Sequence, residues 1–240
     1  MNLYAYCLSD EVTPDLIDRS QGLEGVAARV IEYESIKAVV SDFHGERAQT
    51  NRENILAHES VINRVMTHTT PLPFRYGAVT TAARLESYVS THAAAILAQL
   101  SRVRGAVEMS VKIIWDAEAV QRAAAEAAGG EQVFGSSETM GPGAAFLAAK
   151  RREVAGHEAL KKQAGEIARW LEDRLRETIR ESSVRVCPTR GMAIAAAHLV
   201  ERARLDEYRA RVAEARNARP DLRFLTSGAW SPYSFCELSS

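Results

Sequence analysis

Six histidines are the residues of this chain best suited to acid–base or metal chemistry, because imidazole titrates near neutral pH and is a common metal ligand. No two of them have the spacing of an HExxH helix or of another paired metal-binding motif. We therefore interpret them as structural or solvated side chains, and we predict no catalytic residue, no metal site and no cofactor. They are His44, His58, His68, His92, His157 and His198.

Three cysteines and two glycine clusters offer no further chemistry. Cys7, Cys187 and Cys236 lie far apart, form no CxxC or zinc spacing, and their odd number disfavours a disulfide framework. We expect reduced thiols in a cytoplasm, with Cys7 as a small buried residue on an apolar strand. The glycines at 129–130 and 141–143 make no GxGxxG or Walker pattern, so phosphate binding is not predicted.

A short aromatic segment, Phe74-Arg75-Tyr76, is a candidate for partner binding. One interpretation is a pair of aromatic side chains on a strand, with Arg75 paired to a carboxylate. The other is an interaction surface, where aromatic residues and arginine are enriched. The sequence leaves both open, and we predict Phe74, Arg75 and Tyr76 as partner-binding residues.

The C-terminal tail is the second aromatic segment. Trp230, Tyr233 and Phe235 fall within six residues, whereas a chain terminus is normally frayed unless something holds it. The tail either docks on its own domain and buries its rings, or it is offered to a partner. We predict these three residues as partner-binding residues as well.

The composition limits the classes of partner. Thirty basic residues nearly balance thirty-one acidic residues, and a net charge of −1 gives no general attraction to nucleic acid or to an anionic membrane. No run approaches the roughly 18 apolar residues of a membrane span. We therefore expect a soluble protein with no nucleic-acid or membrane partner.

The stretch around which the chain is organised is Gly105–Asp116, GAVEMSVKIIWD. Val107, Met109, Val111, Ile113 and Trp115 share one parity, while Glu108, Ser110 and Lys112 share the other. Because a strand points successive side chains to opposite faces, this pattern predicts a strand with one buried face and one partly wetted face. We interpret it as the first strand of a second domain.

The chain before this strand predicts a β-α-β-β-α-β order. Strands are expected at 2–9, 26–33, 36–43 and 71–79, with helices at 13–19 and 50–67. This order is the ferredoxin-like arrangement. A strongly amphipathic helix at 80–102 follows, with a stripe containing Leu85, Tyr88, Val89, His92, Ile96 and Leu100.

The chain from Gly105 onward repeats the pattern with an inserted helix and loop. Helices are predicted at 117–128, 144–182 and 205–217, strands at 184–187, 192–200 and 222–226, and a loop at 129–143. The fold class is therefore α+β, with two ferredoxin-like units joined by a helix. The expected boundaries are 1–79 for the first domain, 80–104 for the connecting helix and 105–240 for the second domain with its aromatic tail.

The chain resembles the gas vesicle protein F/L family (GvpF/GvpL) in several segments that occur in the family's order and span nearly the whole sequence. The tail departs from the family form, which resembles GPWPPYSF, because Ala229 and Ser231 stand where that form has prolines. Two restraints on φ are thereby lost. The matching segments are NLYAY at 2–6, PLPFRYGAV at 71–79, GAVEMSVKIIWD at 105–116, GAAFLAAKR at 143–151 and LTSGAWSPYSF at 225–235.

The resemblance implies a non-enzymatic accessory protein located at the gas vesicle. Such a protein helps to assemble the hollow shell or forms a minor component of it, and its partners are the hydrophobic shell-forming protein and other accessory gas vesicle proteins. An unassembled shell subunit is apolar and prone to aggregate, so a partner that holds it needs exposed strand edges or apolar patches. The resemblance implies no catalytic residues.

Two other classes of function compete with this interpretation. Tandem βαββαβ units also form small-molecule-sensing regulatory modules, an alternative that depends on fold analogy alone and predicts a saturable thermal shift with a metabolite. An RNA-binding module of the RRM type shares the topology, but it needs an RNP1-like motif and a basic sheet. Neither appears in this sequence, which disfavours RNA binding.

Overall fold

The computed structural model describes residues 1–129, 142–189 and 191–236, and the chain divides into two compact units. Unit 1 contains Met1–Met109, Leu199–Ala203 and the tail from Gly228, and unit 2 contains Ser110–His198 and Arg204–Ser227. The predicted fold class is confirmed: the chain is mixed α+β with two antiparallel sheets. The units are defined by spatial contacts, so the domain boundaries expected along the sequence stay a prediction.

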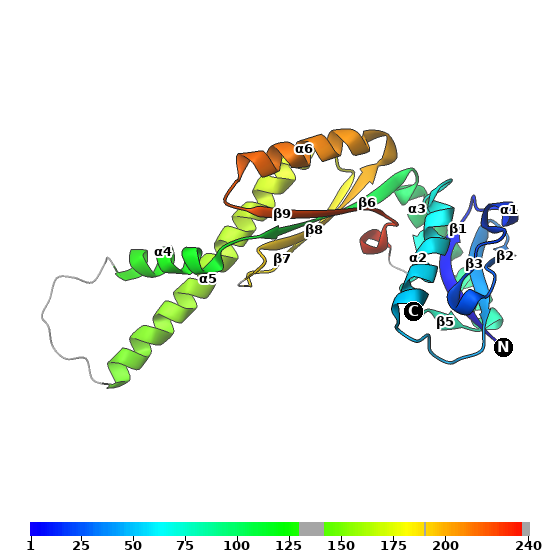
Figure 1. Ribbon diagram of the computed structural model, residues 1–240, viewed down its shortest axis with the longest axis horizontal. Helices are drawn as coiled ribbons and strands as arrows, with labels where there is room; N and C mark the ends of the chain where they lie inside the picture. The colour runs from blue at the N-terminus through cyan, green and yellow to red at the C-terminus, as the bar shows by residue number, and fades with distance from the viewer. Residues whose placement is uncertain (130–141, 190, 237–240) are drawn as a thin grey trace, which may run out of the picture. The chain divides into compact units, whose positions relative to one another are not determined.

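Unit 1 is built on the first sheet, whose strand order is β2-β3-β1-β4, with β5 also paired to β1 (Figure 1). Along the chain, β1 is followed by α1, the hairpin β2–β3, α2 and the short strand β4, and this β-α-β-β-α-β order is ferredoxin-like. Its elements are β1 (Asn2–Ser9), α1 (Pro14–Ile17), η1 (Leu23–Gly25), β2 (Arg29–Tyr33), β3 (Ile36–Phe43), α2 (Arg52–Met66), β4 (Leu72–Pro73), β5 (Val79–Thr80) and α3 (Ala82–Val103).

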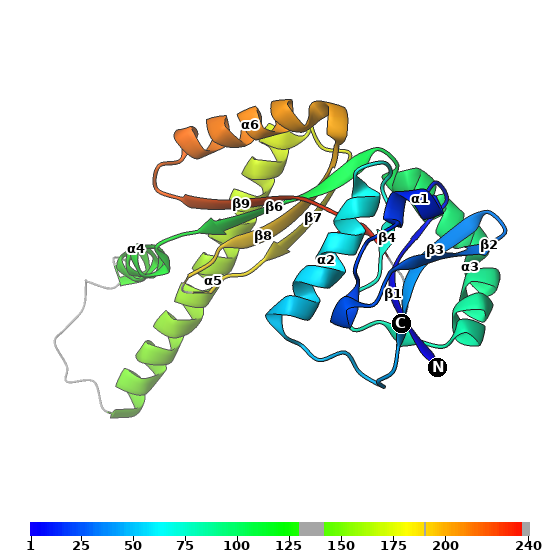
Figure 2. The same cartoon turned by 45° about the vertical axis from the view of Figure 1, so that its right-hand side comes forward.

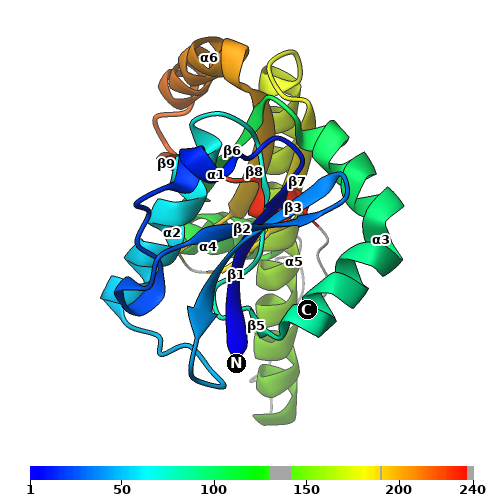
Figure 3. The ribbon, with the colours of Figure 1, turned by 90° about the vertical axis from the view of Figure 1, so that its right-hand side faces the viewer.

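The central strand β1 forms the core of unit 1, and all of its residues except Asn2 are buried. It pairs antiparallel with β3, from Asn2 opposite Phe43 to Ser9 opposite Lys37. The hairpin β2–β3 turns at Glu34, which adopts φ +52. Helices α2 and α3 both pack on this sheet (Figure 3).

Helix α2 begins at a defined cap, because the Asn51 side chain accepts a hydrogen bond from Asn54 N–H. Its buried residues recur at three- and four-residue intervals, among them His58, Ile62 and Val65, and this spacing turns one face to the sheet. Helix α3 is capped by Thr81 in the same way and buries Leu85 within its predicted stripe. Both predicted helices are confirmed to within two residues at each end.

The second sheet has the strand order β7-β8-β6-β9, which repeats the order of the first sheet. The ends of β6, β8 and β9 belong to unit 1. The remaining elements are β6 (Ala106–Ile114), α4 (Ala117–Gly129), α5 (Pro142–Leu175), β7 (Glu181–Val186), β8 (Ile194–Glu201), η2 (Arg202–Arg204), α6 (Leu205–Ala218), β9 (Arg223–Trp230) and η3 (Tyr233–Phe235).

Helix α5 is the main helix of unit 2, and it contacts α4, α6 and β7 (Figure 2). The sequence predicts an apolar stripe of six residues on this helix, and five of them are buried: Leu160, Ala164, Ile167, Leu171 and Leu175. The sixth, Ile179, lies beyond the end of the helix and is only half-buried, so that part of the stripe is wrong. The helix ends earlier than the predicted 182, because both the amide and the hydroxyl of Thr178 donate to Leu175 O at 2.8 Å. Most of the loop predicted at 129–143 lies outside the described residues.

Candidate functional site

The segment Phe74–Ala78 leaves the sheet between β4 and β5 and carries the first predicted site residues. The single strand predicted at 71–79 is therefore two short strands, each paired to β1. Gly77 adopts φ +94, a conformation that favours glycine. Three bonds hold the segment on β1: Phe74 N–H donates to Tyr6 O, Ala78 O accepts from Ala5 N–H, and Gly77 N–H donates to Tyr4 Oη, at 2.8, 2.9 and 3.0 Å.

Phe74 lines an apolar pocket of about 280 Å³ on unit 1. One wall comes from β1, the segment Phe74–Ala78 and β5, and the other comes from the first two turns of α3. A buried apolar cavity of about 150 Å³ already holds a benzene ring, so this pocket has room for a large apolar side chain. The lining residues are Ala5, Phe74, Ala78, Val79, Thr80, Arg84, Leu85 and Tyr88.

The only charged residue that lines this pocket is Arg84, and the exposed Arg75 lies next to Phe74 in the sequence. Among the described residues, neither guanidinium forms an ion pair, so the predicted pairing of Arg75 with a carboxylate is absent from this part of the chain. An apolar pocket with a charged residue among its lining atoms suits an apolar side chain near a carboxylate.

A buried aromatic cluster lies beneath the segment and centres on His58. The His58 ring lies 5.7 Å from the rings of both Tyr4 and Tyr76. Its Nδ1 is 2.9 Å from Tyr4 Oη, and its Nε2 is 3.2 Å from Tyr233 Oη. Burial lowers the pKa of His58 to about 4, so the imidazole is neutral at pH 7 and acts as a buried hydrogen-bonding group.

The tail packs on its own unit. Tyr233 Oη donates to Glu59 Oε1 at 2.9 Å, and the amide and hydroxyl of Ser234 donate to the two carboxylate oxygens of Glu108 at 2.7 and 2.8 Å. Phe235 is 6% exposed, and Arg102 donates to its carbonyl oxygen. Trp230 remains 40% exposed.

The structure therefore brings Tyr76 and Tyr233 together through His58, it leaves Arg75 and Trp230 exposed, and it half-buries Phe74 in the wall of the apolar pocket. A partner-binding role for the six predicted residues stays a prediction. The sequence reading missed Arg84 and its pocket, because Leu85 and Tyr88 read as an ordinary core stripe of α3. It also treated His58 only as structural or solvated, since nothing nearby in the sequence indicated its two phenol partners.

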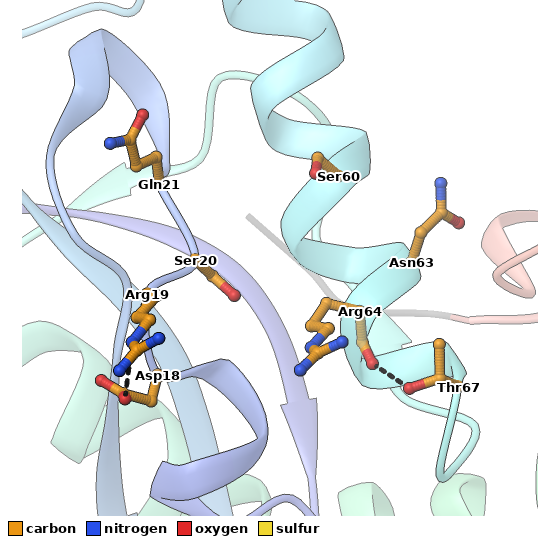
Figure 4. Close-up of a pocket in the computed structure, with 8 residues that line it drawn as sticks. All are labelled: Asp18, Arg19, Ser20, Gln21, Ser60, Asn63, Arg64 and Thr67. Carbon is orange, nitrogen blue, oxygen red and sulfur yellow. Dashed lines mark hydrogen bonds and ion pairs between the residues drawn. The ribbon is translucent and has the colours of Figure 1, made fainter.

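A second, polar groove of about 680 Å³ lies between α2 and the loop after α1 (Figure 4). Three residues of α2 and its C-cap residue Thr67, at positions i, i+3, i+4 and i+7, form one wall, and four consecutive loop residues form the other. The lining residues are Asp18, Arg19, Ser20, Gln21, Ser60, Asn63, Arg64 and Thr67.

Within residues 1–129, 142–189 and 191–236, no three His, Cys, Asp or Glu side chains cluster as metal ligands do. None of the helices described there has the length and apolar character of a membrane-spanning helix. His198, in unit 2, is fully buried, and its Nδ1 lies 2.8 Å from Tyr208 Oη.

Comparison with known proteins gives a family match over nearly the whole chain. The family model described as gas vesicle synthesis protein GvpL/GvpF matches residues 2–237. Gas vesicle protein F1 of Halobacterium salinarum is 29% identical over 121 residues. That match covers 47% of this chain and 54% of the halobacterial protein, so it spans about half of each.

Two crystal structures share the fold. GvpF from Anabaena sp. PCC7120 superposes with a TM-score of 0.79, at 22% identity, over 100% of this chain and 97% of the other. GvpF from Microcystis aeruginosa superposes with a TM-score of 0.78, at 22% identity, over 99% of each chain. The whole-chain coverage shows that both units of this protein occur in these structures.

Proposed function

Because the chain belongs to the GvpL/GvpF family of gas vesicle synthesis proteins, we propose that it acts without catalysis, by binding the hydrophobic shell-forming gas vesicle protein during assembly of the vesicle. The observation that carries this proposal is the apolar pocket beside Phe74. It is preformed, because three hydrogen bonds to β1 fix the segment that lines it.

The chemistry of the pocket fits an unassembled shell subunit. Such a subunit exposes apolar side chains and unpaired strand edges, which makes it prone to aggregate. The pocket would accept one large apolar side chain, and Arg84 would pair with a carboxylate of the subunit. Binding would keep the subunit from self-association until it joins the shell, and the proposed location is the growing gas vesicle.

The test is co-purification of the shell-forming protein with the tagged full chain from cells that express both. We expect Phe74→Ala and Arg84→Glu each to reduce the recovered shell protein at least about fivefold, since anchor residues dominate binding. Leu56→Ala is the matched control, because Leu56 is 57% exposed on α2 and does not line the pocket. Circular dichroism and thermal melting of each variant verify the fold.

Full recovery of the shell protein with both pocket variants would reject the pocket as its binding site. Loss of binding in Trp230→Ala alone, with Phe74→Ala unchanged, would place the contact on the tail instead. Failure of the unmodified chain to recover any shell protein would reject the proposed function itself.

A further inference from the structure

The polar groove between α2 and the loop Asp18–Gln21 has a chemistry different from that of the apolar pocket. Ser60, Asn63, Arg64 and Thr67 share one face of α2, and the opposite face of that helix is buried against the sheet. An outward helix face is normally convex and solvated. Here the loop stands opposite that face, so the two walls border an open, shallow groove whose volume of about 680 Å³ lies within the range of about 300–1,000 Å³ typical of ligand sites.

Arg64 is fixed in position and presents its guanidinium to the groove. Its Nε donates to Leu16 O at 2.9 Å, and in Figure 4 the guanidinium and the Ser20 hydroxyl point toward one another from the two walls. In the described part of the chain its two Nη groups have no hydrogen bond or ion pair. A planar guanidinium held in this way is ready for a bidentate carboxylate.

The opposite wall is held just as firmly. Ser20 N–H donates to Ile17 O, and Ala28 N–H donates to Ser20 O, both at 2.9 Å. Further along the loop, Leu23 N–H donates to the buried Tyr6 Oη at 2.9 Å. Arg19 adopts φ +64, which is strained for a residue other than glycine. The loop therefore keeps a strained backbone conformation at Arg19, and in this conformation Arg19 and Ser20 line the groove.

The charges select among anions. Asp18 also lines the groove, 3.8 Å from Arg19, and its carboxylate would repel a phosphate dianion. A peptide carrying single carboxylates avoids most of that repulsion, and its backbone N–H groups find acceptors in Asp18 and in the serine hydroxyls. We propose that this groove binds an extended acidic peptide segment of a partner protein, with a Glu or Asp carboxylate on Arg64. This site is separate from the proposed shell-binding pocket.

The experiment measures fluorescence anisotropy of a fluorescein-labelled, end-capped Gly-Glu-Gly-Glu-Gly peptide with the full chain at low ionic strength. We expect it to bind at least about tenfold more tightly than the Gly-Gln-Gly-Gln-Gly peptide, and we expect millimolar inorganic phosphate not to displace it. Arg64→Gln should weaken binding about tenfold. Arg52→Gln, at an exposed arginine of the same helix that does not line the groove, should leave it unchanged.

A second variant separates binding from folding. Ser60→Asp retains Arg64 and places a carboxylate four residues before it on the same helix face, where it should pair with the guanidinium and weaken binding of the acidic peptide by a similar factor. Equal affinity for the two peptides, unchanged binding in both groove variants, or displacement by phosphate would each overturn the proposal. Because Arg64 lies outside the apolar pocket, Arg64→Gln should still recover the shell protein, which keeps this test independent of the proposed function.

Discussion

Tyr233 Oη lies 2.9 Å from Glu59 Oε1 and 3.2 Å from His58 Nε2, so one phenol of the tail joins two consecutive residues of α2. The hydrogen bonds around it form a chain with a defined direction. The phenol donates to the Glu59 carboxylate, and its oxygen is then left to accept from His58 Nε2–H. At the other end, Gly77 N–H donates to Tyr4 Oη, whose own proton is directed to His58 Nδ1.

Replacing Tyr233 by Phe removes both of these bonds and keeps the ring. We expect the free energy of unfolding to fall by about 1–2 kcal/mol, because His58 Nε2–H loses its buried acceptor and Glu59 loses a donor. Urea unfolding followed by circular dichroism measures the change. Hydrogen exchange of residues 228–236 should also become faster in this variant.

Tyr33→Phe is the matched control for the tail variant. Its phenol is half-buried, and the structure gives it no hydrogen bond within the described residues, so the free energy of unfolding should change by no more than about 0.5 kcal/mol. If Tyr233→Phe changes neither the free energy of unfolding nor the hydrogen exchange of residues 228–236, the phenol does not hold the tail.

The alternation at Gly105–Asp116 predicted the strand β6 correctly but misplaced Glu108. The residues of one parity are buried as expected, yet Glu108, on the parity predicted to be wetted, is only 7% exposed. Ser234 covers its carboxylate with two hydrogen bonds. Periodicity reports how a strand meets its own sheet, and it carries no information about a segment that arrives from 126 positions later in the chain.

Lowering the pH should destabilise the protein through two buried histidines. Burial lowers the pKa of both His58 and His198 to about 4, below the ordinary value of 6.5. Between these values the unfolded chain binds more protons than the folded one, so stability is fully present above pH 6.5 and is lost as pH falls toward 4. Protonation of each histidine should lower the free energy of unfolding by on the order of 3 kcal/mol between pH 6.5 and pH 4.

Urea midpoints measured at intervals from pH 7 to pH 4 test this expectation. The midpoint should fall steadily below pH 6.5, and His58→Gln with His198→Gln should flatten that part of the curve. Leu56→Ala, at an exposed residue that does not titrate, should leave the slope unchanged. A midpoint that stays constant from pH 6.5 to pH 4.5 in the unmodified chain would contradict the assigned direction.

His198 and Tyr208 form a buried pair in unit 2 whose energies should not add. Their side chains meet at 2.8 Å, and His198 Nε2 is buried with no hydrogen-bond partner in the described chain. Tyr208→Phe leaves a second imidazole nitrogen without a hydrogen bond, and His198→Leu leaves the buried Tyr208 hydroxyl without its partner. Each variant should therefore lower the free energy of unfolding by about 1–3 kcal/mol. The double variant removes both polar groups and should cost less than the sum.

A double-mutant cycle of unfolding free energies measures the coupling, which we expect to lie between about 0.5 and 3 kcal/mol. Purely additive effects would mean that the 2.8 Å contact contributes nothing to stability. The pair also shows why the sequence could not reveal it. His198 alternates with apolar residues in β8 and reads as one more strand position, and its partner lies on the following helix.

The elements that could be predicted from the sequence are those with signals in neighbouring residues. Apolar residues at three- and four-residue intervals are a short-range pattern, and this pattern predicted α2 and α3 to within two residues at each end, although His92 of the predicted α3 stripe is exposed. The end of α5 depends on one side chain, Thr178, whose bonds to Leu175 O stop a helix that the periodicity extends to 182. The apolar pocket depends on a segment that leaves the sheet after β4, and only Gly77 marks that departure in the sequence.

Replacing Gly22 or Gly165 by alanine should change the free energy of unfolding in opposite directions. A Cβ at Gly22 would lie 1.9 Å from Tyr6 Oη, and Tyr6 cannot move easily because it bonds Ser41 Oγ and Leu23 N–H, both at 2.9 Å. Gly22→Ala should therefore cost about 1–3 kcal/mol of unfolding free energy through overpacking. At Gly165, inside α5, a Cβ meets nothing within 4 Å. Gly165→Ala should stabilise the chain by about 0.5–1 kcal/mol.

Thermal and urea unfolding of the two variants provide the comparison, and a third variant identifies the cause. Tyr6→Phe in the Gly22→Ala background removes the atom nearest to the new Cβ and should recover part of the loss, although it gives up the bond to Leu23 N–H. No recovery at all would place the cost of Gly22→Ala in the backbone rather than in the contact with Tyr6. Because Gly22 continues the loop that forms one wall of the polar groove, Gly22→Ala should also weaken the acidic peptide, while Gly165→Ala should not.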